Sequence, residues 1–125
     1  MNSPSSNNSL GSRGEQIATS FLVKNGYKII EKNFKIRYGE IDIIVLDPTK
    51  KILVFVEVKT RTSDEFGTPF EAITYFKLKS VIKTAQVYKL SHKNLPDAMR
   101  IDAIAVTIDG TSDPVVEHLE NISGF

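Results

Sequence analysis

The stretch from Gly39 to Thr60 limits how this chain can fold more than any other part of the sequence. Its second half begins with the wholly apolar run Ile52–Val56, and such a run is typical of a central strand buried on both faces. Its first half, Gly39–Val45, alternates between polar and apolar residues. A polar segment with a proline, Asp47–Lys50, separates the halves and predicts a hairpin with a longer loop. A buried central strand requires a sheet around it.

Charged residues enter the second strand where its apolar run ends. Successive strand residues point to opposite faces, so Glu57 and Lys59 continue the face of Leu53 and Phe55. The same rule predicts one face of the first strand with Glu40, Asp42 and Ile44, and the other with Ile41, Ile43 and Val45. Because an isolated buried charge is very costly, the charges on this face need partners.

The pairing of the two strands supplies those partners. In one register Asp47 pairs with Ile52, which places Asp42 directly opposite Glu57. In the alternative, shifted by two residues, Asp42 lies diagonal to Glu57 on the same face. Either register keeps Asp42, Glu57 and Lys59 within side-chain reach of one another.

Two carboxylates this close repel unless positive charge lies between them. Lys59 supplies one positive charge, and a divalent cation such as Mg²⁺ or Mn²⁺ is the obvious second. Asp42 and Glu57 would hold it through oxygen, together with a backbone carbonyl such as that of Val58 and several waters. This set suits metal-assisted phosphodiester hydrolysis, with Lys59 orienting the attacking water or stabilising charge on the phosphate.

Composition narrows the classes of protein and of partner. A chain of 125 residues predicts one domain. The net charge of +1 means that any surface for nucleic acid must be local. The absence of cysteine excludes disulfides and thiolate metal sites. No apolar run has membrane-spanning length and no secretory leader is recognisable, so a cytoplasmic protein without membrane partners is expected.

The remaining pattern completes an α/β fold in the order α-β-β-β-α-β, a mixed central sheet flanked by helices. A disordered Ser/Asn-rich tail is expected over 1–12, followed by a single domain over 13–125. The expected elements are a helix from Arg13 to Asn25, a strand within Tyr27–Phe34, the hairpin, a loop over Ser63–Pro69, a helix from Pro69 or Phe70 to Leu90, a strand over Arg100–Ile108, and either a short edge strand or a surface segment near Val115.

The second helix carries charge of one sign. Every charged residue from Ala72 to Pro96 is a lysine, whereas an ordinary solvated helix face usually mixes signs. Two interpretations stay open, a lysine-rich solvent face and a local surface for phosphates. The second makes Arg61, Lys77, Lys79 and Lys83 the expected nucleic-acid contacts.

Two further acids allow more than one interpretation. Glu15 borders the apolar stripe of the first helix, where it is either a first-turn acid favoured by the helix dipole or a third carboxylate leaning toward the sheet. The sequence alone favours the first. Asp102 lies inside a strand, and a structural pair with Arg or Lys is expected there rather than a metal.

The chain resembles the YraN family of small bacterial proteins over nearly its whole length after the tail. The resemblance lies in Gly14-Glu15 with Ala18, Gly26-Tyr27, Asn33-Phe34, Gly39–Asp42, Phe55–Arg61, Phe66-Gly67, Glu71–Ile73, Lys77 and Arg100–Asp102. That family looks like the restriction-endonuclease-like superfamily and is most similar to archaeal Holliday-junction resolvases.

The resemblance implies Asp42, Glu57 and Lys59 as a catalytic core, and it moves Glu15 to an additional catalytic acid. It further implies a metal-dependent nuclease acting on DNA, in a branched or damaged form, with a homodimer expected only by analogy. Two alternatives remain: a nucleic-acid-binding module that keeps the fold without catalysis, and a purely structural network of buried ion pairs.

Overall fold

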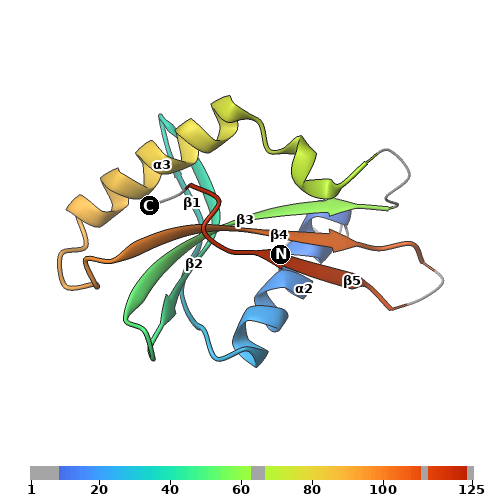
Figure 1. Cartoon of the computed structure of the whole chain (residues 1–125), viewed down its shortest axis with the longest axis horizontal. Helices are drawn as coiled ribbons and strands as arrows, with labels where there is room; N and C mark the ends of the chain where they lie inside the picture. Colours follow the sequence, from blue (N-terminus) through green and yellow to red (C-terminus); the bar gives the residue numbers. More distant parts are fainter. Residues whose placement is uncertain (1–8, 63–66, 111–112, 124–125) are drawn as a thin grey trace, which may run out of the picture.

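The computed structural model describes residues 9–62, 67–110 and 113–123 (Figure 1). Its elements are α2 (Leu10–Lys24), β1 (Lys28–Ile36), β2 (Gly39–Asp47), β3 (Ile52–Arg61), the short 3₁₀ helix η1 (Pro69–Ala72), α3 (Tyr75–Leu90), β4 (Met99–Thr107) and β5 (Val115–Leu119). The expected α/β class with a mixed sheet between helices is confirmed. Residues 1–8 of the predicted tail and 63–66 of the predicted loop lie outside the described residues.

The sheet has five strands in the order β1-β2-β3-β4-β5. β3 and β4 run parallel, and the other neighbouring pairs run antiparallel. The chain returns from β3 to β4 through α3, which lies above the sheet in Figure 1, while α2 lies below it. None of the helices in the described part of the chain is both long and apolar enough to span a membrane.

Both helices start at side-chain caps that shift their predicted bounds. α2 begins at Leu10 rather than Arg13, because the Ser9 hydroxyl accepts the N–H of Ser12 at 3.1 Å. α3 begins at Tyr75, where the Thr74 hydroxyl caps it. The predicted start at Pro69 or Phe70 is therefore wrong, since extended backbone at Ile73 and Thr74 separates η1 from α3.

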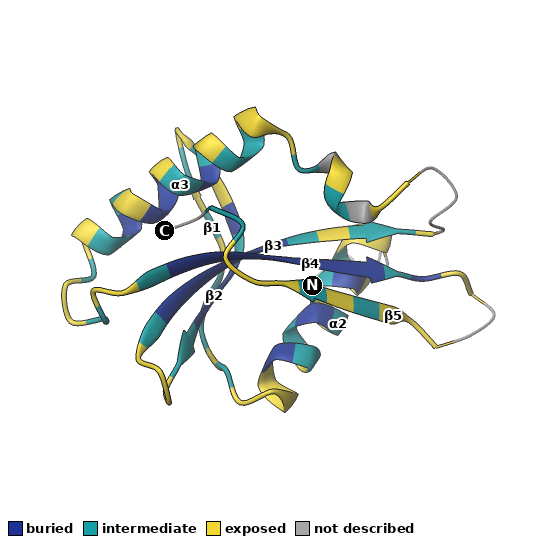
Figure 2. Ribbon diagram, in the orientation of Figure 1, coloured by how far each residue is buried: buried dark blue, intermediate teal, exposed yellow. Residues whose placement is uncertain are grey.

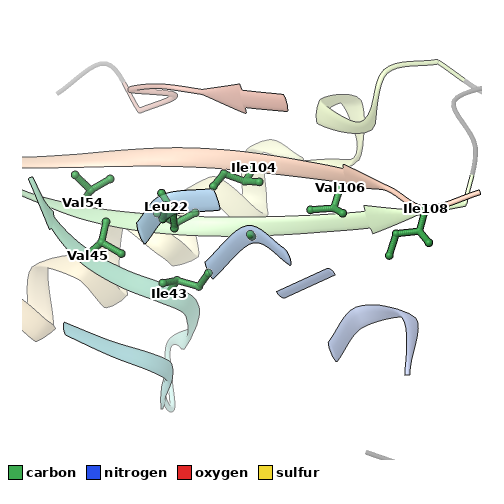
Figure 3. Packing of buried hydrophobic residues seen from close by; sticks show 9 residues of the cluster. Leu22, Ile43, Val45, Val54, Ile104, Val106 and Ile108 are labelled. Carbon is green, nitrogen blue, oxygen red and sulfur yellow. The ribbon is translucent and has the colours of Figure 1, made fainter. Parts of the chain in front are cut away.

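Apolar clusters cover both faces of the sheet, which accounts for the buried central strands in Figure 2. The cluster on the α2 side, drawn in Figure 3, contains Ala18, Leu22, Ile43, Val45, Val54, Val56, Ile104, Val106 and Ile108. The cluster on the α3 side contains Ile41, Ile44, Leu53, Phe55, Val81, Ala85, Tyr88 and Ile101. The predicted split of β3, with Leu53 and Phe55 on one face and its valines on the other, is confirmed.

The predicted alternation of β2 is wrong at Ile41, which packs with Ile44 on the α3 side. The interruption coincides with Asn33 in β1, whose φ of 56° is left-handed. Asn33 lies between the pairs that join Lys32 to Ile43 and Phe34 to Ile41. The register of β1 against β2 does not shift at Asn33, and the shift between these strands lies at Ile29 and Glu31.

Candidate active site

The site forms where β2 leaves β3. Pairing between the two strands runs from Asp47 with Ile52 as far as Ile43 with Val56, which confirms the first of the two predicted registers. β3 continues beside β4, while β2 continues beside β1. We call the opening past the Ile43–Val56 pair the fork.

At the fork a side-chain hydrogen bond replaces the backbone hydrogen bonds between β2 and β3. The N–H of Val58 donates to Oδ2 of Asp42 at 2.7 Å. This bond satisfies a strand N–H that has left its backbone partner, and it fixes the Asp42 carboxylate against β3. The sequence periodicity of β3 brings Glu57 to the α3 side of the same opening.

Glu57 is buried with incomplete pairing. Only 6% of the residue is exposed. Its Oε2 lies 3.3 Å from Nζ of Lys77 on α3. Its Oε1 is buried without a hydrogen-bond partner. Because buried carboxylate oxygens normally have partners, this oxygen marks a place where a donor or a cation fits.

Both acids of the fork have a raised pKa. The pKa of the Glu57 carboxyl is raised to about 7, first by burial and then by the charge of Asp42, and Lys77 opposes the rise. Burial also raises the pKa of Asp42, against the hydrogen bond from Val58. The charge of Glu15 raises the pKa of Asp42 further. The fork therefore holds more negative charge than its neighbours neutralise.

Glu15 reaches the fork from α2. Its Oε1 accepts from Nδ2 of Asn33 at 3.0 Å and lies 3.6 Å from Nζ of Lys32. Gly14 allows the approach, because a Cβ there would lie 1.8 Å from Oγ1 of Thr60 on β3. Glu15 and Asp42 line one depression of about 340 Å³.

Lys59 stands at the mouth of the fork. It lines the depression that holds Glu15, and a second of about 330 Å³ that holds Glu57 and Lys77. Asp42 and Val58 line both. Lys59 itself is exposed. An exposed lysine beside a buried and a half-buried carboxylate is placed to meet an anionic group arriving from solvent.

A family model described as uncharacterised protein family UPF0102 matches residues 14–106. The chain belongs to this family. The matched residues include all four acids and bases of the fork predicted from sequence, Glu15, Asp42, Glu57 and Lys59. The resemblance to YraN proteins is thereby confirmed, while the family description names no activity.

UPF0102 proteins from several bacterial genera resemble this chain over most of their length. One from Geobacter metallireducens is 44% identical over 115 residues, 92% of each chain. One from Caldanaerobacter subterraneus subsp. tengcongensis is 50% identical over 100 residues, 80% of each chain. One from Mycobacterium sp. strain KMS is 38% identical over 114 residues, 91% of this chain and 84% of that one.

The fork of this UPF0102 protein has the donors for a hard cation, though few of them. The unpartnered Oε1 of Glu57 and the raised pKa values of Glu57 and Asp42 both fit a bound positive charge. Among the described residues, no group of three or more His, Cys, Asp or Glu side chains surrounds one point. A cation here would rely on two carboxylates, a carbonyl such as that of Val58, and water.

The four predicted nucleic-acid contacts do not share one surface. Lys77 points into the fork toward Glu57, whereas Lys79 and Lys83 are exposed on the outer side of α3. Nη1 of Arg61 donates to the carbonyl of Gly67 at 2.9 Å. Lys77 is thus part of the site itself, and the outer lysines form a separate surface.

Two contacts of the structure were missed from sequence. Asn33 orients Glu15, and its position in a β-prone segment gave no signal beyond the tolerance of asparagine for left-handed backbone. His118 binds Oδ2 of Asp102 through Nε2 at 2.7 Å. The predicted structural pair of Asp102 is confirmed, since Nε of Arg100 donates to its Oδ1 at 2.9 Å.

Proposed function

We propose that this UPF0102 protein is a metal-dependent nuclease that hydrolyses phosphodiester bonds in DNA. The observation that carries the proposal is that two carboxylates of raised pKa, the buried Glu57 and the half-buried Asp42, line one depression with the exposed Lys59. Perturbed carboxylates that line a depression are typical of catalytic sites. A network built for stability alone would pair both oxygens of Glu57.

Each residue of the fork has a defined task in this proposal. Asp42, Glu57 and the Val58 carbonyl would hold Mg²⁺ or Mn²⁺, which when bound polarises the phosphoryl oxygen and acidifies a water. Lys59 orients the attacking water or stabilises the charge that develops on the phosphate. Glu15, held by Asn33, is the additional acid on the far side of Asp42.

Lys77 offsets part of the negative charge of the fork. Its ammonium lies against Glu57, where it lowers the pKa of that carboxyl. With a cation held by Glu57, the same ammonium would be available to a phosphate oxygen. Arg61, Lys79 and Lys83 add positive charge around the site for the DNA backbone.

The test is cleavage of linear, flapped and four-way DNA with Mg²⁺ or Mn²⁺. Wild type should cut at least one of these, and Asp42→Asn should cut none and lose metal binding in calorimetry. Lys59→Met should bind DNA as wild type does but cut it slower by about two or more orders of magnitude. Arginine at this position should rescue poorly, because it cannot give up a proton.

Lys50→Met is the matched control, since Lys50 is an exposed lysine in the turn at the opposite end of the hairpin. It should cut at the wild-type rate. DNA binding by wild type without cleavage under either metal would favour the alternative, a non-catalytic binding module. A Lys59→Met protein with wild-type turnover would remove the assigned mechanism. A homodimer and a cytoplasmic location stay predictions.

A further inference from the structure

Two large aromatic side chains at the start of α3 are exposed to solvent. Tyr75 is 69% exposed and Phe76 is 79% exposed. Their ring centroids lie 5.7 Å apart in an edge-to-face arrangement. Scattered exposed apolar residues are ordinary, but adjacent exposed rings offer a contiguous apolar surface that usually serves binding.

Lysines accompany these rings and a third aromatic. Nζ of Lys79 lies 5.6 Å from the ring centroid of Tyr75. Nζ of Lys83 lies 4.3 Å from the ring centroid of Tyr38, which is 46% exposed. The Ser80 hydroxyl donates to the Tyr38 carbonyl at 2.6 Å and so fixes the β1–β2 turn to α3. We call the set Tyr38, Tyr75, Phe76, Lys79 and Lys83 the aromatic–lysine face.

The aromatic–lysine face and the fork both include residues of the first turns of α3. Lys77 follows Phe76 directly, yet its ammonium reaches Glu57. At 3.6 residues per turn, Lys77 lies on the sheet side of α3 and the aromatic–lysine face on its outer side. Figure 2 shows this outer side of α3 exposed along its length. A strand with one phosphate in the fork would therefore pass close to the first turn of α3.

We propose that the aromatic–lysine face binds unpaired nucleotides of the DNA strand that enters the fork, so that the substrate class is DNA with a single-stranded segment. The inference rests on the proposed function, since it specifies the substrate of that site. Rings stack on exposed bases whatever their sequence, and neighbouring lysines meet the phosphates between them. In an intact duplex the bases are already stacked on one another, so the rings cannot stack on them.

Charge argues for a nucleic acid rather than a protein on this face. From Ala72 to Pro96 the sequence contains lysines and no acid. A typical protein interface enriches aromatic residues but depletes lysine, whereas grooves for single strands combine the two. The face thus has the two chemistries that a flexible polyanion with aromatic bases requires.

The experiment compares binding of a single-stranded oligonucleotide, a flapped duplex and a blunt duplex, by fluorescence anisotropy without divalent metal. The double variant Tyr75→Ala/Phe76→Ala should bind single-stranded and flapped DNA at least about tenfold more weakly than wild type. Its affinity for blunt duplex should change by less than about twofold, and its salt slope should stay the same because no phosphate contact is lost. Leu90→Ala is the control, a 71% exposed apolar residue at the other end of α3.

Three outcomes would overturn the inference: an equal loss on all three DNAs, no loss on any, or no DNA binding by wild type. Circular dichroism and thermal melting should match wild type, since both rings are exposed. Cleavage separates the two proposals. If wild type binds single strands through these rings but cuts nothing with Mg²⁺ or Mn²⁺, the nuclease proposal fails alone. If wild type cuts and the double variant binds and cuts flapped DNA equally well, only this inference fails.

Discussion

Glu57→Gln should make the protein more stable at neutral and alkaline pH, although it removes one side of an ion pair. Glu57 is 6% exposed, and its ionised form faces Asp42 in a poorly solvated place. Glutamine keeps nearly the same shape and removes the charge. The prediction follows from the balance in the fork, where burial and Asp42 together outweigh the help that Lys77 gives.

The pKa of Glu57 sets both the size of the stability change and the pH range in which it occurs. This pKa rises from an ordinary 4.5 to about 7. Between these values the native state holds a proton that the unfolded state has released, so wild-type stability falls as pH increases. Below this window both states are protonated and the effect is absent, and above it the loss is complete. At about 1.4 kcal/mol per pKa unit the full loss is about 3 kcal/mol.

Urea denaturation at about pH 5 and about pH 8 measures the effect. The free energy of unfolding of Glu57→Gln should exceed that of wild type by about 1–3 kcal/mol at the higher pH and by less than about 1 kcal/mol at the lower, which lies near the acid end of the window. The lower figure allows for the buried amide that glutamine leaves partly unpaired. Some pH dependence should persist, because the pKa of Asp42 is also raised.

Glu117→Gln is the control, since Glu117 is exposed on β5 and its replacement should change nothing at either pH. A Glu57→Gln protein as stable as wild type at both pH values would show that solvent or a rearranged Lys77 already neutralises Glu57. That result would remove the electrostatic basis of the candidate site, whatever the fate of the nuclease assay.

Three further predictions test other contacts. Lys77→Met should destabilise the protein more above about pH 7 than near pH 5, because the ion-pair partner of the ammonium, Glu57, is ionised at the higher pH and protonated at the lower; an equal loss at both pH values would mean that Lys77 acts by packing. Gly14→Ala should lower the free energy of unfolding by about 1–3 kcal/mol, because its Cβ would overlap Thr60, and a variant that melts with wild type would contradict the close approach of α2. Asp102→Asn should cost about 3–5 kcal/mol in denaturation experiments, because it removes the buried carboxylate that pairs with the Arg100 guanidinium and leaves it the Tyr27 hydroxyl and the exposed Glu120; a loss below about 1 kcal/mol would show that the pair is dispensable.

The sequence predicted the hairpin and narrowed its register to two, of which the structure has the first, because strand pairing across a short turn depends on local rules. Apolar periodicity alone divides β3 between the two faces and places Glu57 beside Asp42. It failed at Ile41, which packs with Ile44 on the α3 side of the sheet. The apolar periodicity of β2 gives no sign of this departure.

Contacts between segments far apart in the sequence were the second feature that could not be predicted from the sequence. Lys77 was expected only as one phosphate contact among several, and its ion pair with Glu57 arises from where α3 packs. The start of α3 also could not be chosen from the sequence. Both Thr74, whose hydroxyl caps the helix, and Pro69 are residues that suit a helix start. Position in the fold, rather than residue type, decides such roles.

The hydrogen bond from the Val58 amide to Asp42 gives the protein a built-in spectroscopic reporter. Most strand amides of β3 bond to carbonyl groups, whose charge does not change with pH or with ligands. The Val58 amide instead faces a carboxylate at 2.7 Å, so protonation of Asp42 or a cation bound to it should move its ¹H and ¹⁵N resonances. Hydrogen exchange at the same amide measures how often β2 and β3 separate at the fork. One backbone proton thus reports both the charge and the opening of the site, without any substrate.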